Sequence, residues 1–125
     1  MLNDIESYRN TLSDQGKYWY DAVVSYMKEH HPEYALVLSY QRPTFKLKGQ
    51  IFLMLGGGKE HFSIYTTDFD YVINLKEKSI KGLKFGKSAV LFQFKHREHL
   101  ELAFQMMDEV ILRVQSGMIG SSSYI

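Results

Sequence analysis

The chain has 125 residues and a mass of 14.6 kDa, a length typical of one domain with its own hydrophobic core. It contains no cysteine, which excludes disulfides, thiolate catalysis and cysteine-ligated zinc or iron–sulfur sites. The net charge is +1, and no apolar run reaches the roughly 18–20 residues of a membrane span. The acidic start, without an apolar core, is unlike a signal peptide. We therefore expect a single cytoplasmic domain over residues 1–125.

The near-neutral total hides an uneven distribution of charge. Residues 1–33 carry six acids and three bases, a net charge of −3. Residues 34–95 carry four acids and ten bases, a net charge of +6, and residues 96–125 carry four acids and two bases, a net charge of −2. The middle of the chain is therefore basic and its two ends are acidic.

The first predicted element is a helix from near Ser13 to about His30. Ser13 or Asp14 is a suitable N-cap, because a short side-chain oxygen can accept a free backbone N–H. Trp19, Val23 and Met27 recur at helical spacing and predict one apolar stripe. Residues 2–12 have the pattern of an earlier helical turn.

The middle of the chain changes to an alternating pattern that predicts strands. The alternation covers residues 36–41, and further predicted strands cover residues 44–48, 51–55, 61–66, 83–85 and 89–95. We expect a hairpin around Pro43 and a short turn at Lys48-Gly49-Gln50, and residues 68–78 fit a short helix capped by Asp68. Gly56-Gly57-Gly58-Lys59 lacks the spacing of a phosphate-binding P-loop, so we interpret it as a hairpin turn.

The last predicted element is a helix from Arg97 to about Gln115, followed by a Gly/Ser-rich segment over 117–125 that we expect to be a loose tail. The element order indicates an α+β fold: a helix, an antiparallel sheet of about five strands, and a closing helix. We expect both terminal helices to cover one face of the sheet.

Strand alternation sorts the side chains of the sheet into two sets. The set expected to face inward is apolar: Phe45, Leu47, Phe62, Ile64, Val90, Phe92 and Phe94. The set expected to face outward is polar and basic: Lys46, Lys48, His61, Ser63, Tyr65, Lys84, Gln93 and Lys95. A solvated face that prevents edge-to-edge aggregation explains these lysines, and a face that binds an anion or a partner explains them as well.

Two further patterns concern metals and nucleic acids. His96 and His99 are three residues apart at the start of the last helix, so they share a face and are the candidate metal ligands, although a complete site takes three or four ligands. Eighteen aromatic residues interleave with lysines, but most fall on the inward set and the isoelectric point is about 7.9. Nucleic-acid binding is therefore not expected.

The segment Ser39-Tyr40-Gln41-Arg42-Pro43-Thr44-Phe45 and the basic residues after it resemble the YdhG-like family of small bacterial proteins, a domain of unknown function. The resemblance continues through the strand with His61 and Tyr65 and through residues 86–92, and it covers about residues 14–115. It implies a fold like that of frataxin. Because some relatives are described as iron chaperones, it also implies iron as a cofactor, by resemblance alone.

Three functional hypotheses follow. The leading one is a non-catalytic binding or adaptor domain that presents Tyr40, Arg42, Lys46, His61, Tyr65 and Lys84 to a small anionic ligand or an acidic protein partner. The second is frataxin-like iron binding or delivery, through the acidic first helix or through His96 and His99. The third is an enzyme with a pocket on the sheet face, for which the sequence assigns no catalytic residue. A homodimer is compatible with all three.

Overall fold

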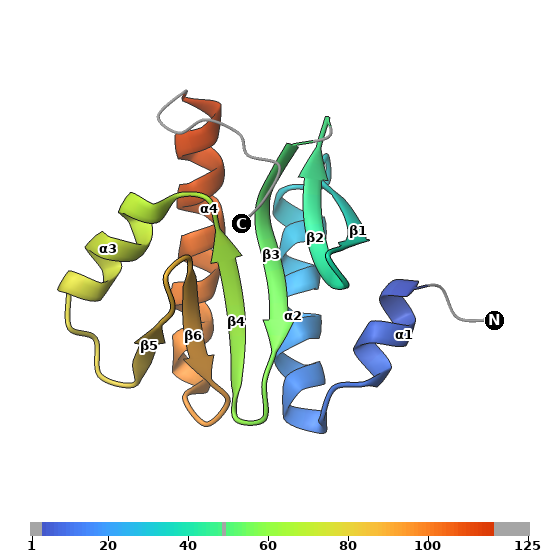
Figure 1. Ribbon diagram of the computed structural model, residues 1–125, viewed down its shortest axis with the longest axis horizontal. Helices are drawn as coiled ribbons and strands as arrows, with labels where there is room; N and C mark the ends of the chain where they lie inside the picture. The colour runs from blue at the N-terminus through green and yellow to red at the C-terminus, as the bar shows by residue number, and fades with distance from the viewer. Residues whose placement is uncertain (1–3, 49, 117–125) are drawn as a thin grey trace.

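The structure is a computed structural model, and it describes residues 4–48 and 50–116. The expected loose tail over 117–125, and the expected turn at Gly49, lie outside the described residues. Within them, four α-helices and one six-stranded sheet follow the chain in an α+β order (Figure 1). The elements are α1 (Asp4–Asn10), α2 (Asp14–His30), β1 (Ala35–Ser39), β2 (Arg42–Leu47), β3 (Gln50–Gly57), β4 (His61–Thr66), α3 (Phe69–Glu77), β5 (Leu83–Phe85), β6 (Ala89–Gln93) and α4 (Leu100–Gln115), with a short 3₁₀ turn at Arg97–His99.

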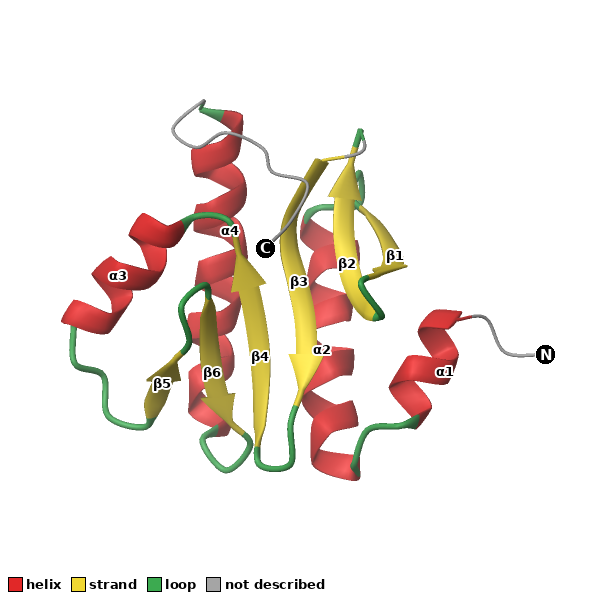
Figure 2. Cartoon of the chain, in the orientation of Figure 1, coloured by secondary structure: helices red, strands yellow, loops and turns green. Residues whose placement is uncertain are grey.

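The sheet is antiparallel throughout, with the strand order β1-β2-β3-β4-β6-β5. The last two strands lie in the reverse of their chain order. After β4, α3 leads the chain away from the sheet, β5 forms the edge strand, and β6 then pairs between β4 and β5. A register shift between Phe45 and Lys46 marks an irregularity in the pairing of β2 with β3. In the views of Figures 1 and 2, α1 lies beside the β1–β2 hairpin and α3 lies at the opposite side of the sheet.

The expectation of about five strands is wrong by one. The alternation over residues 36–41 and the predicted strand over 44–48 follow each other closely, with a hairpin expected around Pro43. In the structure, Pro43 lies within β2 and the reversal comes slightly earlier, at Tyr40 and Gln41. Both residues have left-handed backbones, with φ of 53° and 63°. This is the conformation of a two-residue hairpin turn that normally selects Asn-Gly, so the sequence carries no ordinary signal for it.

The two long helices cover one face of the sheet, as expected from the sequence (Figure 2). Trp19 of α2 is fully buried and stacks with Phe62 and Phe92, at ring-centroid distances of 6.3 and 5.7 Å. Its indole N–H donates a hydrogen bond to the carbonyl oxygen of Phe94, at 3.3 Å. The side chains predicted to face inward are buried or half-buried, which confirms the strand alternation.

Side-chain caps and side-chain hydrogen bonds hold the helices in place. Ser13 caps α2 by accepting a hydrogen bond from the N–H of Gly16, at 3.1 Å, as one of the two predicted cap residues. The carboxylate of Asp108 on α4 accepts from the Tyr26 hydroxyl and pairs with His31 Nε2 at 2.7 Å, which joins α4 to α2. The hydrogen bond to Asp108, assisted by burial, raises the pKa of Tyr26 to about 12.

Candidate functional site

A polar cavity of about 270 Å³ lies where the β1–β2 turn, the end of β3 and the start of β4 meet. We call it the tyrosine–arginine pocket. It brings together four of the six residues that the sequence placed in a binding face: Tyr40 and Arg42 from the β1–β2 turn region, and His61 and Tyr65 from β4. Its full lining is Tyr8, Tyr40, Gln41, Arg42, Gly56, Gly57, His61, Ser63 and Tyr65.

The strands explain why these side chains converge. His61, Ser63 and Tyr65 alternate along β4 and therefore point to the same face of the sheet, the face opposite α2 and α4. Arg42 is the first residue of β2, directly after the turn. The left-handed backbones of Tyr40 and Gln41 close that turn at the rim of the pocket.

Glycines next to the pocket allow its side chains to lie close to the backbone. A Cβ atom at Gly56 would lie 3.1 Å from the Tyr65 ring, tighter than nearly all real contacts. A Cβ atom at Gly58 would lie 2.7 Å from the His61 ring, which no real structure tolerates without a shift. The segment Gly56-Gly57-Gly58-Lys59, which the sequence predicts as a turn, is partly strand. Gly56 and Gly57 end β3, and the turn begins at Gly58.

The electrostatics of the pocket favour an anion. Its lining includes a guanidinium, an imidazole and several hydroxyl groups, and none of the described lining residues is Asp or Glu. The Arg42 guanidinium lies 4.7 Å from the centroid of the Tyr65 ring. No carboxylate among the described residues forms a salt bridge with Arg42. Its hydrogen-bond donors are thus available to a ligand.

Tyr8 adds a hydroxyl from α1 that the sequence did not predict. Its oxygen accepts a hydrogen bond from the N–H of Gly57, at 3.2 Å. Burial raises the pKa of the Tyr8 phenol above its usual value, although the Gly57 hydrogen bond and the Arg42 charge act in the opposite direction. The phenol therefore keeps its proton at neutral pH and can donate it to a ligand.

The two lysines predicted for the same site are elsewhere. Lys46 lies near the other end of β2, opposite Ala35 of β1. Lys84 lies on β5, the far edge strand, with β3, β4 and β6 between it and β2. The alternation assigned Lys84 to the correct face, but a strand pattern does not predict strand order, so the sequence grouped residues that the sheet separates.

Ser63, Gln41 and Tyr8 also line the pocket, although the sequence did not place them in the binding site, and the sequence signal differs among them. Ser63 belongs to the outward set of the sequence pattern and is buried in the structure, so it was within reach of the prediction. Gln41 lies between two predicted residues and enters the site only through the turn. Tyr8 is 49 positions away from its contact at Gly57, and no local pattern connects them.

His96 and His99 do come together, as the candidate metal pair. Their ring centroids are 5.2 Å apart, and His96 Nδ1 lies 3.1 Å from the Glu98 carboxylate. His99 is buried, and its Nδ1 atom has no hydrogen-bond partner among the described residues. However, no group of three or more His, Asp or Glu able to hold a metal ion occurs among the described residues. The pair therefore lacks the ligand number of an ordinary metal site.

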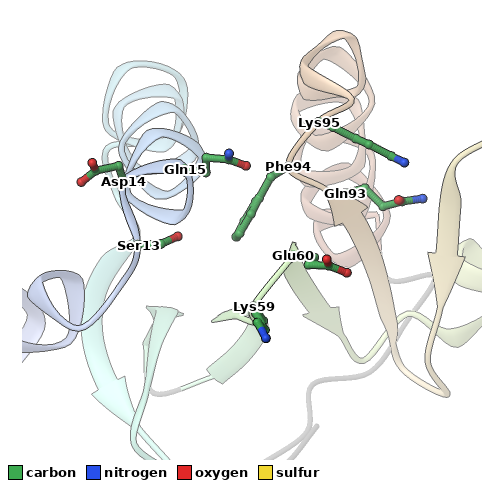
Figure 3. A pocket seen from close by; sticks show the side chains of 8 residues that line it. All are labelled: Ser13, Asp14, Gln15, Lys59, Glu60, Gln93, Phe94 and Lys95. Carbon is green, nitrogen blue, oxygen red and sulfur yellow. The ribbon is translucent and has the colours of Figure 1, made fainter.

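A larger hollow, of about 500 Å³, lies at the N-terminus of α2 and next to the β3–β4 turn (Figure 3). Phe94 points into it, while the charged side chains around it have both signs: Asp14 and Glu60 against Lys59 and Lys95. The Ser13 hydroxyl already accepts the capping hydrogen bond of α2. This hollow is larger than the tyrosine–arginine pocket, but its charges do not converge on one kind of ligand.

Comparisons with known proteins agree with this fold. No protein-family model matches the chain, and no curated protein matches it. Among solved structures, YdhG of Bacillus subtilis, a protein of the DUF1801 family, matches with a TM-score of 0.64 over 83% of this chain and 89% of that chain, at 13% sequence identity. The resemblance seen in the sequence is thus supported at the level of the fold. No helix among residues 4–48 and 50–116 is long and apolar enough to cross a membrane.

Proposed function

We propose that this protein is a small, non-catalytic, cytoplasmic binding domain that holds a small anionic ligand in the tyrosine–arginine pocket. The observation that carries the proposal is that the Arg42 guanidinium forms no salt bridge with a described residue, in a pocket lined by hydroxyls and an imidazole and without a described carboxylate. A guanidinium makes paired, charge-assisted hydrogen bonds to phosphate or carboxylate oxygens. Hydroxyl groups from Tyr8, Ser63 and Tyr65 supply further donors around the same anion.

The conformation of the β1–β2 turn gives independent support. A non-glycine residue in the left-handed region costs about 1–2 kcal/mol, and the turn contains two in succession. Tyr40 and Gln41 both line the pocket, where Asn-Gly would relieve the strain but remove their side chains. Strain of this kind is typical of positions that serve a site.

The test is a titration with inorganic phosphate and phenyl phosphate, followed by backbone and imidazole NMR shifts. We expect the shifts to cluster on the pocket residues. Arg42→Gln removes the charge and should weaken binding about ten- to hundredfold, the value of one or two charge-assisted hydrogen bonds. Arg97→Gln is the matched control, because Arg97 also stacks on a tyrosine, at 3.9 Å from the Tyr18 ring, but does not line the pocket. Equal weakening in both variants would mean nonspecific attraction and would contradict the proposal.

Three alternatives can be separated from this one by experiment. A frataxin-like iron-binding function, with a frataxin-like fold, would use His96 and His99, and it predicts heat on anaerobic titration with ferrous iron that the double alanine variant loses. An acidic protein partner at the same pocket predicts capture that depends on Arg42, without response to small phosphates. An enzyme working in the pocket predicts turnover, for example release of phosphate from p-nitrophenyl phosphate, that Arg42→Gln reduces.

A further inference from the structure

The two edge strands of the sheet differ in how they are protected. The β5 edge has three residues, with Lys84 at its centre and Lys81 and Lys87 on either side. Short length and lysine are the usual means by which an edge avoids pairing with another chain. The β1 edge is Ala-Leu-Val-Leu-Ser, five residues without charge or proline. The protection found on β5 is therefore absent from β1.

The register of the β1–β2 hairpin shows which backbone groups of β1 face outward. In a two-residue hairpin the residues that flank the turn form a hydrogen-bonded pair, here Ser39 with Arg42. Hydrogen-bonded pairs alternate, so Leu36 and Leu38 direct their N–H and C=O groups away from β2. Opposite Leu38 stands Pro43, which has no N–H. Outside the sheet, neither leucine forms a hydrogen bond with a described residue.

The side chains of β1 are also only partly covered. Val37 and Leu38 are each 36% exposed, although they point to opposite faces of the sheet. Helix α1 packs beside the hairpin (Figure 1), and Val37 and Leu38 keep this exposure next to it. The edge thus combines free backbone groups with exposed apolar surface on both sides.

We propose that two copies of this chain associate by antiparallel pairing of β1 with β1 about a two-fold axis at Val37. In this arrangement Leu36 lies opposite Leu38 of the second copy, and each pair exchanges both backbone hydrogen bonds. Leu36 and Leu38, whose N–H and C=O groups point away from β2, are placed symmetrically about Val37. A second β1 strand in the opposite direction therefore offers its own Leu38 and Leu36 groups as partners to both. Because the strand is uncharged, two copies meet without like-charge repulsion. The pairing joins two six-stranded sheets and is closed by its symmetry.

The absence of cysteine makes this pairing testable by a single substitution. In the proposed pair, Val37 faces Val37 of the second copy as a non-hydrogen-bonded pair, with Cα atoms about 4.5 Å apart. That distance is within the range of a disulfide, about 4.4–6.8 Å. Under oxidised glutathione, Val37→Cys should therefore form a covalent dimer that dithiothreitol reverses. Ala35→Cys is the matched control: it is exposed on the same strand, but the two copies of residue 35 would be about 13 Å apart.

Sedimentation velocity of the unmodified chain provides the second measurement. We expect a concentration-dependent dimer, and Val37→Lys should raise its dissociation constant at least tenfold by placing two cations at the axis. Three results would overturn the proposal: a monomer at all concentrations, equal cross-linking of Ala35→Cys and Val37→Cys, or open-ended oligomers in place of a dimer. None of these outcomes depends on whether the tyrosine–arginine pocket binds phosphate, so the two proposals are tested separately.

Discussion

Replacing Asp68 by alanine should destabilise the fold more than any other single loss of a carboxylate. Asp68 is completely buried and caps α3 through the N–H of Tyr71, at 3.1 Å. It also receives two hydrogen bonds from Arg113 of α4, at 2.5 and 3.2 Å. Loss of the cap costs about 1 kcal/mol, and breaking a buried ion pair costs about 3–5 kcal/mol. Because the Arg113 side chain is 20% exposed and can recover hydration, the lower end applies. We expect a total loss of about 4 kcal/mol in the free energy of unfolding.

Urea unfolding measures this loss directly, because the one tryptophan, Trp19, is fully buried and reports on the core. Asp70→Ala is the control: Asp70 lies in the first turn of the same helix but is exposed, so it should cost less than about 1 kcal/mol. Combining Asp68→Ala with Arg113→Met in a double-mutant cycle isolates the ion pair. The reasoning is refuted if Asp68→Ala costs no more than Asp70→Ala, or if the cycle shows no coupling.

Three further predictions concern other parts of the molecule. Burial raises the pKa of Tyr20 to about 12, above its unfolded value of 10. Its contribution of about 3 kcal/mol to the free energy of unfolding is therefore complete below pH 10 and is lost as the pH rises to 12. Tyrosinate absorbance combined with Trp19 fluorescence measures this loss, and Tyr20→Phe should remove the part of the alkaline destabilisation that is due to Tyr20. Asp108→Ala should lower the free energy of unfolding in urea by about 1–2 kcal/mol, since Asp108 is half-exposed. It should also lower the pKa of Tyr26 from about 12, as measured by NMR titration. An unchanged pKa would contradict the role of the hydrogen bond between Tyr26 and Asp108. Replacing Tyr40-Gln41 by Asn-Gly should stabilise the hairpin by about 1 kcal/mol while weakening phosphate binding; a gain of stability with unchanged binding would separate the strain from the site.

Much of the fold could be predicted because the relevant signals are local. The helical stripe through Trp19, Val23 and Met27 predicts the buried face of α2, and all three side chains are buried. Asp68 has the position and the short side chain of a cap, and it caps α3. Period-two alternation along β4 predicts correctly which residues face the helices. Each of these features depends on residues a few positions apart, where the geometry of the element fixes the outcome.

The number and order of the strands could not be predicted in the same way. The sequence predicts a hairpin around Pro43, but the turn uses Tyr40 and Gln41 in left-handed conformations, against their intrinsic preference, so the sequence does not show the exact turn residues. The position of β6 between β4 and β5 depends on how α3 returns the chain to the sheet edge. No alternation pattern contains that information, because it depends on packing between segments that are distant in the sequence.

The charge of the chain shows the same limit and also indicates what a better signal would be. The net +6 of the middle segment predicted a basic face, yet Lys46 and Lys84 are separated by the sheet order, and of the ten bases only Arg42 lines the tyrosine–arginine pocket. What distinguishes Arg42 is its position directly after a strained turn, with its guanidinium 4.7 Å from the centroid of the Tyr65 ring across β3. A count of charges measures long-range attraction, whereas a site depends on the direction of a few donors. The strain at Tyr40 and Gln41 is therefore a more specific indicator of this site than the basic character of the segment around it.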